Sequence, residues 1–257
     1  MLHGQRLFVV IPAYNTGPRV LSVVRTLPDV VDGAVVVDDG SGAETRALLD
    51  DLDEPRVTLC RHGRNRGVGA ALATGYTRAL ELGADLVAVM AGDGQMHPDD
   101  LIPLATPVAL GQVDYAKGDR LGHPSCARVM PLARRAGNLV LSALTRAATG
   151  LRHVHDSQCG YTVVSRRVLL HLDTSRMWTR YGYPNHLLGA LAHAGFRVRD
   201  VPVRPVYGDE RSGIRLRDAL LVIPRILVAI AWARARNRPA GTLGLPLDLR
   251  RAAEPSP

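Results

Sequence analysis

Two short acidic segments carry the residue types in this chain that could bind and activate a charged ligand. Val37-Asp38-Asp39-Gly40-Ser41 has two adjacent carboxylates, and Gly92-Asp93-Gly94-Gln95 has a carboxylate followed by an amide. Carboxylates accept hydrogen bonds from the N–H and O–H groups of a nucleoside, and Mg²⁺ prefers such oxygen ligands. Two other polar segments, Pro12-Ala13-Tyr14-Asn15 and Asn65-Arg66-Gly67-Val68-Gly69, add an aromatic ring and a glycine-rich loop. Taken alone, an Asp-Asp-Gly-Ser run is also typical of a turn that caps a helix.

Each polar segment follows a short apolar run, and helical stretches separate these runs. The order predicts a doubly wound, mostly parallel α/β sheet with its ligand site at the carboxyl ends of the strands. All four segments would then meet at one edge of the sheet. The predicted strands are Leu7–Ile11, Ala34–Val37, Val57–Cys60 and Leu86–Met90, and the predicted helices are Arg19–Leu27, Ala43–Leu52, Val68–Leu82 and Asp99–Leu110.

The second half of the chain is less regular. It predicts a long helix over Ala127–Thr149, then a polar loop from Asp156 that leads into a strand. A helix over Pro184–Ala194 and a strand over Arg197–Val203 follow. We expect residues 1–213 to form one domain with two halves, of about 6–120 and about 121–213.

A basic, apolar helix is predicted over 214–238. Its apolar run after Arg225 is too short to cross a bilayer, which needs about twenty apolar residues. The helix could lie on an anionic membrane surface, or pack on its own domain or in a homodimer interface. Residues 239–257 are expected to form a disordered tail.

The charge balance indicates anionic partners. The 257-residue chain has a net charge of +8, and Lys117 is its sole lysine, so nearly all its cations are arginines. Arginine binds phosphate in a bidentate manner, which suits a nucleotide diphosphate, a lipid phosphate or an anionic membrane surface. Two Trp, two Phe and seven Tyr offer few stacking platforms for nucleic acid, which we therefore do not expect as a partner.

The cysteines and the N-terminus predict a cytoplasmic protein. Cys60, Cys126 and Cys159 are odd in number and widely spaced, which is typical of free thiols in a reducing compartment. The first residues run into a predicted strand without the pattern of a signal peptide.

The ordered set of motifs resembles the family 2 glycosyltransferases. The matching segments are V-V-I-P-A-Y-N (9–15), V-V-V-D-D-G-S (35–41), N-R-G-V-G-A-A-L (65–72) and G-D-G-Q-M-H-P (92–98). D-S-Q-C-G-Y-T-V-V-S-R (156–166) looks like the branch that contains polyprenyl-phosphate (dolichyl-phosphate) sugar synthases. The resemblance covers about residues 6 to 215 and implies the GT-A fold, with about 6–120 as its nucleotide-binding half and about 121–213 as its acceptor half. A Rossmann fingerprint does not fit, because the glycine-rich loop follows the third strand and lacks a third glycine.

The resemblance implies roles for the first three loops in binding a nucleotide sugar. Asp38 and Asp39 are expected to hold the nucleoside, beside a wall formed by Pro12 and Tyr14. The backbone of Asn65 and Gly67, with the side chain of Arg66, could approach the diphosphate.

The fourth loop departs from the family pattern. Family members usually read D-x-D-x-Q, with these residues near a Mg²⁺ or Mn²⁺ on the diphosphate. Ala91 occupies the first Asp position here, while Asp93 and Gln95 match the second Asp and the Gln. Since Mg²⁺ often takes one or two carboxylates plus phosphate oxygens and water, a metal at Asp93 and Gln95 is still expected. Arg120 and Arg211 could neutralise part of the diphosphate charge.

The position of the general base is also unusual. Where many family members have an acidic residue, the segment Tyr183–Leu187 carries His186. A phosphate acceptor is already ionised and needs no base, whereas a hydroxyl acceptor does. The sequence therefore favours a polyprenyl phosphate, although His186 could itself be a base or a residue that merely caps or packs.

Three other segments were weighed as ligand contacts. Arg211 and Ser212 could contact phosphate or lie in an exposed turn. Asp156 and Gln158 are candidate sugar contacts. The nearby histidines at 153 and 155 alternate along an extended segment, so their side chains face opposite ways and are interpreted as structural.

These features predict an inverting glycosyltransferase that moves a sugar from a UDP- or GDP-sugar to a polyprenyl phosphate at the cytoplasmic face of a membrane. One alternative is a soluble family 2 enzyme that glycosylates a hydroxyl of a small molecule. Another is a relative that binds a sugar nucleotide without catalysis, which Ala91 motivates.

Overall fold

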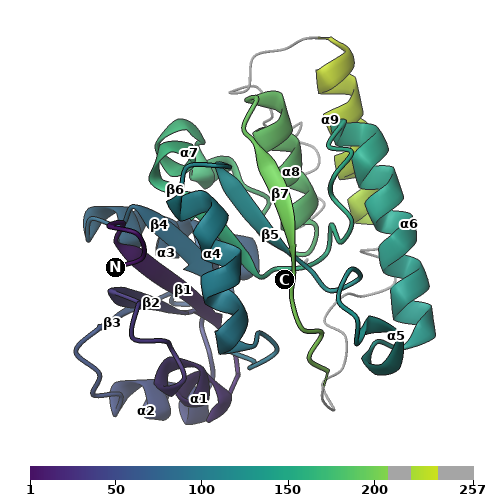
Figure 1. Ribbon diagram of the computed structural model, residues 1–257. Coiled ribbons are helices and arrows are strands. Elements are labelled where there is room, and N and C mark those ends of the chain that lie inside the picture. Colours follow the sequence, from purple (N-terminus) through teal and green to yellow (C-terminus); the bar gives the residue numbers. More distant parts are fainter. Residues whose placement is uncertain (208–220, 237–257) are drawn as a thin grey trace.

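A seven-stranded sheet forms the centre of the computed structural model, which describes residues 1–207 and 221–236 (Figure 1). The strand order is β3-β2-β1-β4-β6-β5-β7, and β6 alone runs antiparallel to its neighbours β4 and β5. The parallel β-α-β-α-β-α-β order predicted for the first half is confirmed. The strands are β1 (Leu7–Ala13), β2 (Gly33–Asp38), β3 (Val57–Arg61), β4 (Leu86–Val89), β5 (Tyr115–Asp119), β6 (Thr162–Ser165) and β7 (Val198–Pro202).

Helices cover both faces of the sheet because its strands are apolar on both sides. Along β1, Val9 and Ile11 face a core layer with α1, α2 and α4, whereas Phe8 and Val10 face a layer with α3, α7 and α8. This alternation is the period of two expected for a strand. The helices are α1 (Arg19–Arg25), α2 (Ala43–Asp50), α3 (Val68–Glu81), α4 (Leu101–Ala109), α7 (Arg166–His171) and α8 (Tyr183–His193).

The structure corrects one predicted helix and adds one strand that was not predicted. The helix predicted over Ala127–Thr149 is broken into α5 (Cys126–Val129) and α6 (Leu132–Thr149), because Met130 is extended before Pro131 and a residue that precedes proline disfavours the helical conformation. Strand β5 was not predicted, since its sequence, Y-A-K-G-D, contains a lysine and an aspartate.

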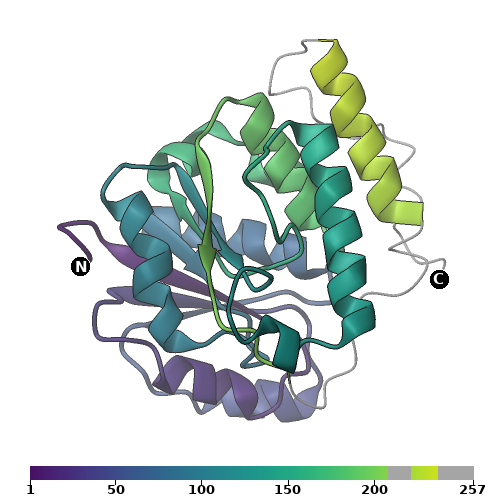
Figure 2. The same cartoon turned by 45° about the vertical axis from the view of Figure 1, so that its right-hand side comes forward.

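The basic apolar segment contains α9 (Ile223–Ala235), which packs against α6 and α8. Figure 2 shows α6 and α9 side by side at one side of the molecule. Within the described ranges, no helix is both long and apolar enough to cross a bilayer. Arg211, Ser212 and the predicted tail at 239–257 lie outside the described residues.

The sheet brings the polar segments to one edge. The carboxyl ends of β1, β2 and β4 lie side by side in parallel register. The antiparallel β6 begins at that same edge, because Thr162 pairs with Val89 of β4 and with Lys117 of β5. The residues just before β6 therefore join the loops that follow β1, β2 and β4.

Candidate active site

The two neighbouring aspartates after β2 are not equivalent. Asp39 is buried, and its carboxylate accepts hydrogen bonds from the backbone N–H groups of Arg66 (2.9 Å) and Gly67 (2.7 Å). Its Oδ1 also lies 2.6 Å from Nδ1 of the buried His62. Asp39 therefore holds the glycine-rich loop in place.

Asp38 has a carboxylate oxygen that receives no hydrogen bond from the described part of the chain. The side chain is fully buried, and its Oδ1 accepts a hydrogen bond from the N–H of Ser41 (2.8 Å). The other oxygen is Oδ2, and Arg46 Nε lies 3.9 Å from it. A buried carboxylate oxygen left without a donor carries a desolvation cost, which an N–H or O–H group of a ligand would relieve.

The loop after β1 is fixed against the loop after β2. The N–H of Asn15 donates to Ser41 Oγ (3.0 Å), and Asn15 Oδ1 accepts from the N–H of Gly42 (2.8 Å). Asn15 has a positive φ of 51°, a conformation that asparagine tolerates better than most residues. The ring of Tyr14 is left half exposed next to this junction.

The first turn of α3 is covered by another part of the chain. The N–H of Gly69 donates to the carbonyl oxygen of Thr179 (2.8 Å). A side chain at Gly69 would overlap the carbonyl oxygen of Trp178, so glycine is needed for this close approach. With the N–H groups of Arg66 and Gly67 on Asp39, three N–H groups of the expected diphosphate loop are bonded within the protein.

The loop after β4 is where Asp93 and Gln95 lie. The N–H of Gln95 donates to Asp93 Oδ1 (3.0 Å), and the N–H of Gly92 donates to the carbonyl oxygen of Pro12 (3.1 Å). Gly94 has a positive φ of 78°, which lets the chain reverse between the two side chains. The loop therefore carries one carboxylate and one amide, both half-buried, beside the loop after β1.

A buried ion pair joins the loop after β5 to the segment before β6. Arg120 donates from Nε (2.7 Å) and Nη2 (3.0 Å) to the two carboxylate oxygens of the fully buried Asp156. Burial raises the pKa of Asp156, but the charge and hydrogen bonds of Arg120 outweigh it, so the pKa lies below its ordinary value. The ammonium group of the fully buried Lys117 donates to the carbonyl oxygen of Asp156.

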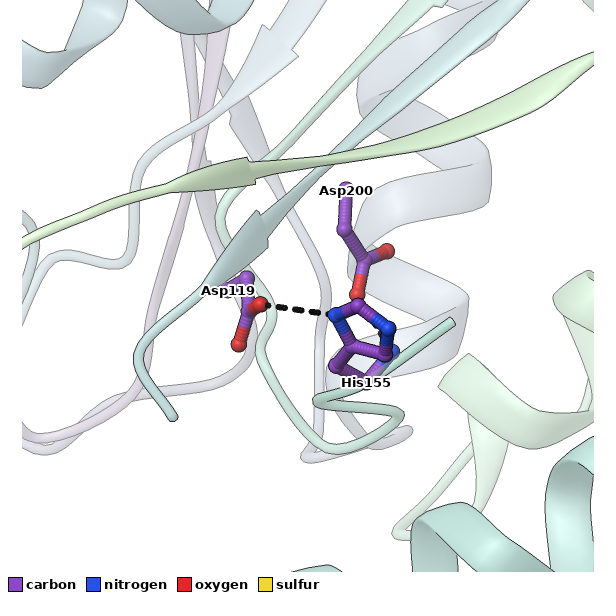
Figure 3. Close-up of side chains that lie close together, drawn as sticks. All are labelled: Asp119, His155 and Asp200. Atoms are coloured by element: carbon purple, nitrogen blue, oxygen red, sulfur yellow. Dashed lines mark hydrogen bonds and ion pairs between the residues drawn. The ribbon is translucent and has the colours of Figure 1, made fainter. Parts of the chain in front are cut away.

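Asp119, His155 and Asp200 lie together at this end of β5 and β7 (Figure 3). His155 Nδ1 is 3.3 Å from Asp119 Oδ2, and one ligand atom from each of the three residues lies within 4.8 Å of the others. The group has the composition of a metal site. Asp200 Oδ2 accepts hydrogen bonds from the N–H groups of His155 and Asp156, whereas its buried Oδ1 has no hydrogen-bond partner among the described residues. The charge of the nearby Lys117 also acts on Asp200, which disfavours a second cation there.

The side chain of Gln158 points into the protein. Its Nε2 donates to Asn185 Oδ1 (3.2 Å), and Asn185 Nδ2 donates to Thr145 Oγ1 (2.7 Å). Asn185 is fully buried at the first turn of α8. The neighbouring His186 is also buried, and its Nδ1 accepts from the N–H of Trp178 (3.4 Å).

The sheet thus collects at one edge most of the residues that the sequence singled out. The carboxyl ends of β1 and β2 and the loops after β1, β2 and β4 hold Pro12, Tyr14, Asp38, Asp39, Asp93 and Gln95. The structure joins Arg120 to Asp156 as an ion pair, whereas the sequence analysis assigned them separate roles. It adds His62 and the pair Lys117 and Asp119, which sequence reasoning missed. The signal for Lys117 was its status as the sole lysine in an arginine-rich chain.

This sheet order, with carboxylates on the loops at its carboxyl edge, defines a GT-A type glycosyltransferase. The chain belongs to glycosyl transferase family 2, whose family model matches residues 8–172. It is therefore an enzyme of the class that the motifs indicated.

Relatives and solved structures agree with this assignment. The chain is 31% identical over 216 residues to UDP-N-acetylglucosamine–dolichyl-phosphate N-acetylglucosaminyltransferase of Methanococcus voltae, covering 78% of this chain and 86% of that protein. It is 30% identical over 245 residues to polyprenol monophosphomannose synthase of Mycolicibacterium smegmatis, covering 91% of each. Its fold is similar to that of glucosyl-3-phosphoglycerate synthase from Mycobacterium tuberculosis in complex with Mn²⁺, UDP and glucosyl-3-phosphoglycerate, with a TM-score of 0.63 and 21% identity over 90% of this chain and 80% of that one.

Proposed function

We propose that this enzyme transfers a sugar from a UDP- or GDP-sugar to a polyprenyl phosphate at the cytoplasmic face of a membrane, with inversion at the anomeric carbon. The names of the two relatives support a lipid-phosphate acceptor. The observation that carries the proposal is that the first turn of α8 has no acidic residue that could act as a general base. The two buried polar residues there, Asn185 and His186, are hydrogen-bonded within the protein.

A hydroxyl acceptor and a phosphate acceptor need different groups at this position. A hydroxyl must lose its proton during transfer, so a base has to lie within hydrogen-bond reach. A phosphate monoester is already an anion near neutral pH, so it can attack without a base. With His186 buried and its Nδ1 accepting from Trp178, the first turn of α8 suits the phosphate acceptor.

The donor is expected to bind across the loops after β1, β2 and β4. Asp38 Oδ2 is the acceptor available for an N–H or O–H group of the nucleoside, and the half-exposed ring of Tyr14 can form a wall beside the base. Asp39 supports this arrangement by fixing the loop of Asn65, Arg66 and Gly67. Because the backbone N–H groups of Arg66 and Gly67 donate to Asp39, that loop would contact a diphosphate through the Arg66 side chain.

A divalent cation fits the loop after β4. Asp93 and Gln95 provide two oxygen ligands on one turn, which is the number that Mg²⁺ commonly takes from protein when diphosphate oxygens and water complete its shell. Bound there, Mg²⁺ or Mn²⁺ would stabilise the charge that develops on the leaving diphosphate.

The acceptor phosphate would meet arginines near the start of α6. Arg134 lies over the ring of Tyr207, with its Cζ 4.8 Å from the ring centroid. The charges of both Arg120 and Arg134 act on Tyr207, although burial raises the pKa of its hydroxyl overall. Arg120 is held by Asp156, which makes Arg134 the cation at this point with no carboxylate partner in the described part of the chain. Arg211 would add to this group.

The test is transfer of labelled sugar from UDP- and GDP-sugars to a short polyprenyl phosphate in detergent, with and without Mn²⁺. We expect a lipid-linked product of inverted anomeric configuration. The Asp93→Asn variant should lose activity by at least about a hundredfold, because it removes the one carboxylate of the cation site. Asp53→Asn, an exposed aspartate after α2, is the matched control and should stay active.

Transfer to a hydroxyl of a small molecule, but not to polyprenyl phosphate, would overturn the proposal in favour of the soluble enzyme. Binding of a sugar nucleotide without any transfer would favour the non-catalytic alternative.

A further inference from the structure

Helix α6 leaves one side of its surface apolar and open to solvent. Leu132 and Leu139 are seven residues apart and Val140 and Leu144 are four apart, so the exposed side chains share one side of the helix. The opposite side carries the buried Asn138, Ser142, Thr145 and Thr149. The large exposed side chains of this stripe are Leu132 (80% exposed), Leu139 (50%), Val140 (59%) and Leu144 (48%).

Helix α9 adds a second stripe beside the first. It buries Ile223, Ile226, Leu227 and Ile230 in a cluster that includes Ala148 of α6. Arg234 of α9 donates to the carbonyl oxygen of Ala147 (3.2 Å), so the carboxyl ends of the two helices lie together. On its outer side, Val228 (68%) and Trp232 (49%) are exposed. The helices lie side by side in both views of the molecule (Figures 1 and 2).

Arginine is the sole charged residue type, histidine aside, in the two sequence ranges that contain these helices. Residues 120–155 contain no aspartate or glutamate, and neither do residues 219–238. Arg225 is exposed on α9, and Arg236 lies with its Cζ 3.7 Å from the ring centroid of Trp232. The surface made by α6 and α9 is therefore apolar and cationic at once.

This charge decides which partner fits the surface. In a symmetric dimer the same patch would face its own copy, so arginines would approach arginines without carboxylates between them, which is unfavourable. An anionic lipid surface complements both features, because acyl chains accept the apolar side chains and headgroups pair with arginine. Tryptophan is also enriched at the level of the headgroups.

We propose that the outward face of α6 and α9 binds the surface of an anionic bilayer. This surface deepens the proposed function and rests on it, since a reaction at a membrane face requires contact with the membrane. Its partner is bulk lipid and not the acceptor, so the two proposals can fail separately. The two are compatible in space: α6 begins at Leu132, two residues before Arg134, which lies over Tyr207 beside Arg120 and Asp156.

The test is co-sedimentation of the full chain with vesicles of phosphatidylcholine, with and without phosphatidylglycerol, and with neither polyprenyl phosphate nor sugar nucleotide present. We expect binding to the anionic vesicles that weakens as salt is raised. The variant Leu139→Ser with Val140→Ser should bind at least tenfold more weakly, a loss of about 1.4 kcal/mol. The matched control is Leu110→Ser with Leu170→Ser, which changes two leucines of similar exposure (50% and 64%), one directly after α4 and one on α7.

A charge variant tests the second feature independently. Arg225→Gln should weaken binding to the anionic vesicles about fivefold, whereas Arg25→Gln on α1 should have no effect. Circular dichroism of each variant checks that it is folded. Absence of wild-type binding, or equal losses in the control variants, would overturn the inference. So would a dimer in analytical ultracentrifugation that the Leu139 and Val140 variant dissociates, because the face would then be an interface between copies.

Discussion

Replacing Asp156 by asparagine tests the buried ion pair that joins the two halves of the site. The carboxylate is fully buried and accepts two hydrogen bonds from Arg120, whose side chain is 21% exposed. Asparagine has the same shape but no charge, so it leaves a largely buried guanidinium without its counter-ion. Breaking a buried pair in this way costs about 3 kcal/mol of unfolding free energy.

The effect can be measured by urea denaturation followed by circular dichroism at pH 7. For an m-value of about 3 kcal/mol/M, the midpoint should fall by about 1 M. Asp29→Asn, an exposed aspartate after α1, should leave the midpoint unchanged. The double variant Arg120→Met with Asp156→Leu should recover most of the loss, because an apolar pair removes both charges.

The pH dependence gives a second readout with a defined sign. The pKa of Asp156 is lowered in the folded protein, so its contribution is fully present above the unfolded value of about 3.8 and is lost as the pH falls through the folded value. The difference in unfolding free energy between wild type and Asp156→Asn should therefore be constant from pH 7 to about pH 5 and become smaller in stronger acid. An unfolding free energy of Asp156→Asn within about 0.5 kcal/mol of the wild-type value at pH 7, which is about the error of such measurements, would refute the reasoning.

Three further predictions concern the other parts of the site. Gly69→Ala should lower the unfolding free energy by about 2 kcal/mol, because the added methyl group overlaps the carbonyl oxygen of Trp178. Gly137→Ala is the control: its added methyl group meets open space, so the unfolding free energy should rise slightly in the same urea titration. Equal effects of the two substitutions would contradict this prediction. Ala91→Asp should tighten Mn²⁺ binding about tenfold in calorimetry with UDP or GDP present, and unchanged affinity would show that position 91 does not face the cation. His186→Gln should leave the pH profile of transfer unchanged near neutrality, and loss of an ionisation from that profile would identify His186 as a base.

Much of this site could be predicted from the sequence because its geometry follows from local patterns. Apolar runs separated by helical stretches predict parallel strands, and parallel strands place the loops that follow them on one edge. The segments with Asp38, Asp93 and Gly67 were thus predicted to meet without knowledge of any contact. Strand β5 escaped prediction because Lys117 and Asp119 break the apolar pattern, although both are buried in the fold.

The sequence by itself determined the family and the edge at which the loops gather, whereas the tertiary structure decided which polar groups remain available. Asp38 and Asp39 look alike in the sequence, yet Asp39 accepts hydrogen bonds from Arg66 and Gly67, 27 and 28 residues away. Asp38 retains a buried oxygen to which no described residue donates. Arg120 likewise pairs with Asp156, 36 residues away. Such contacts depend on strand register and on the packing of distant segments, and neither is encoded in the local spacing of residues.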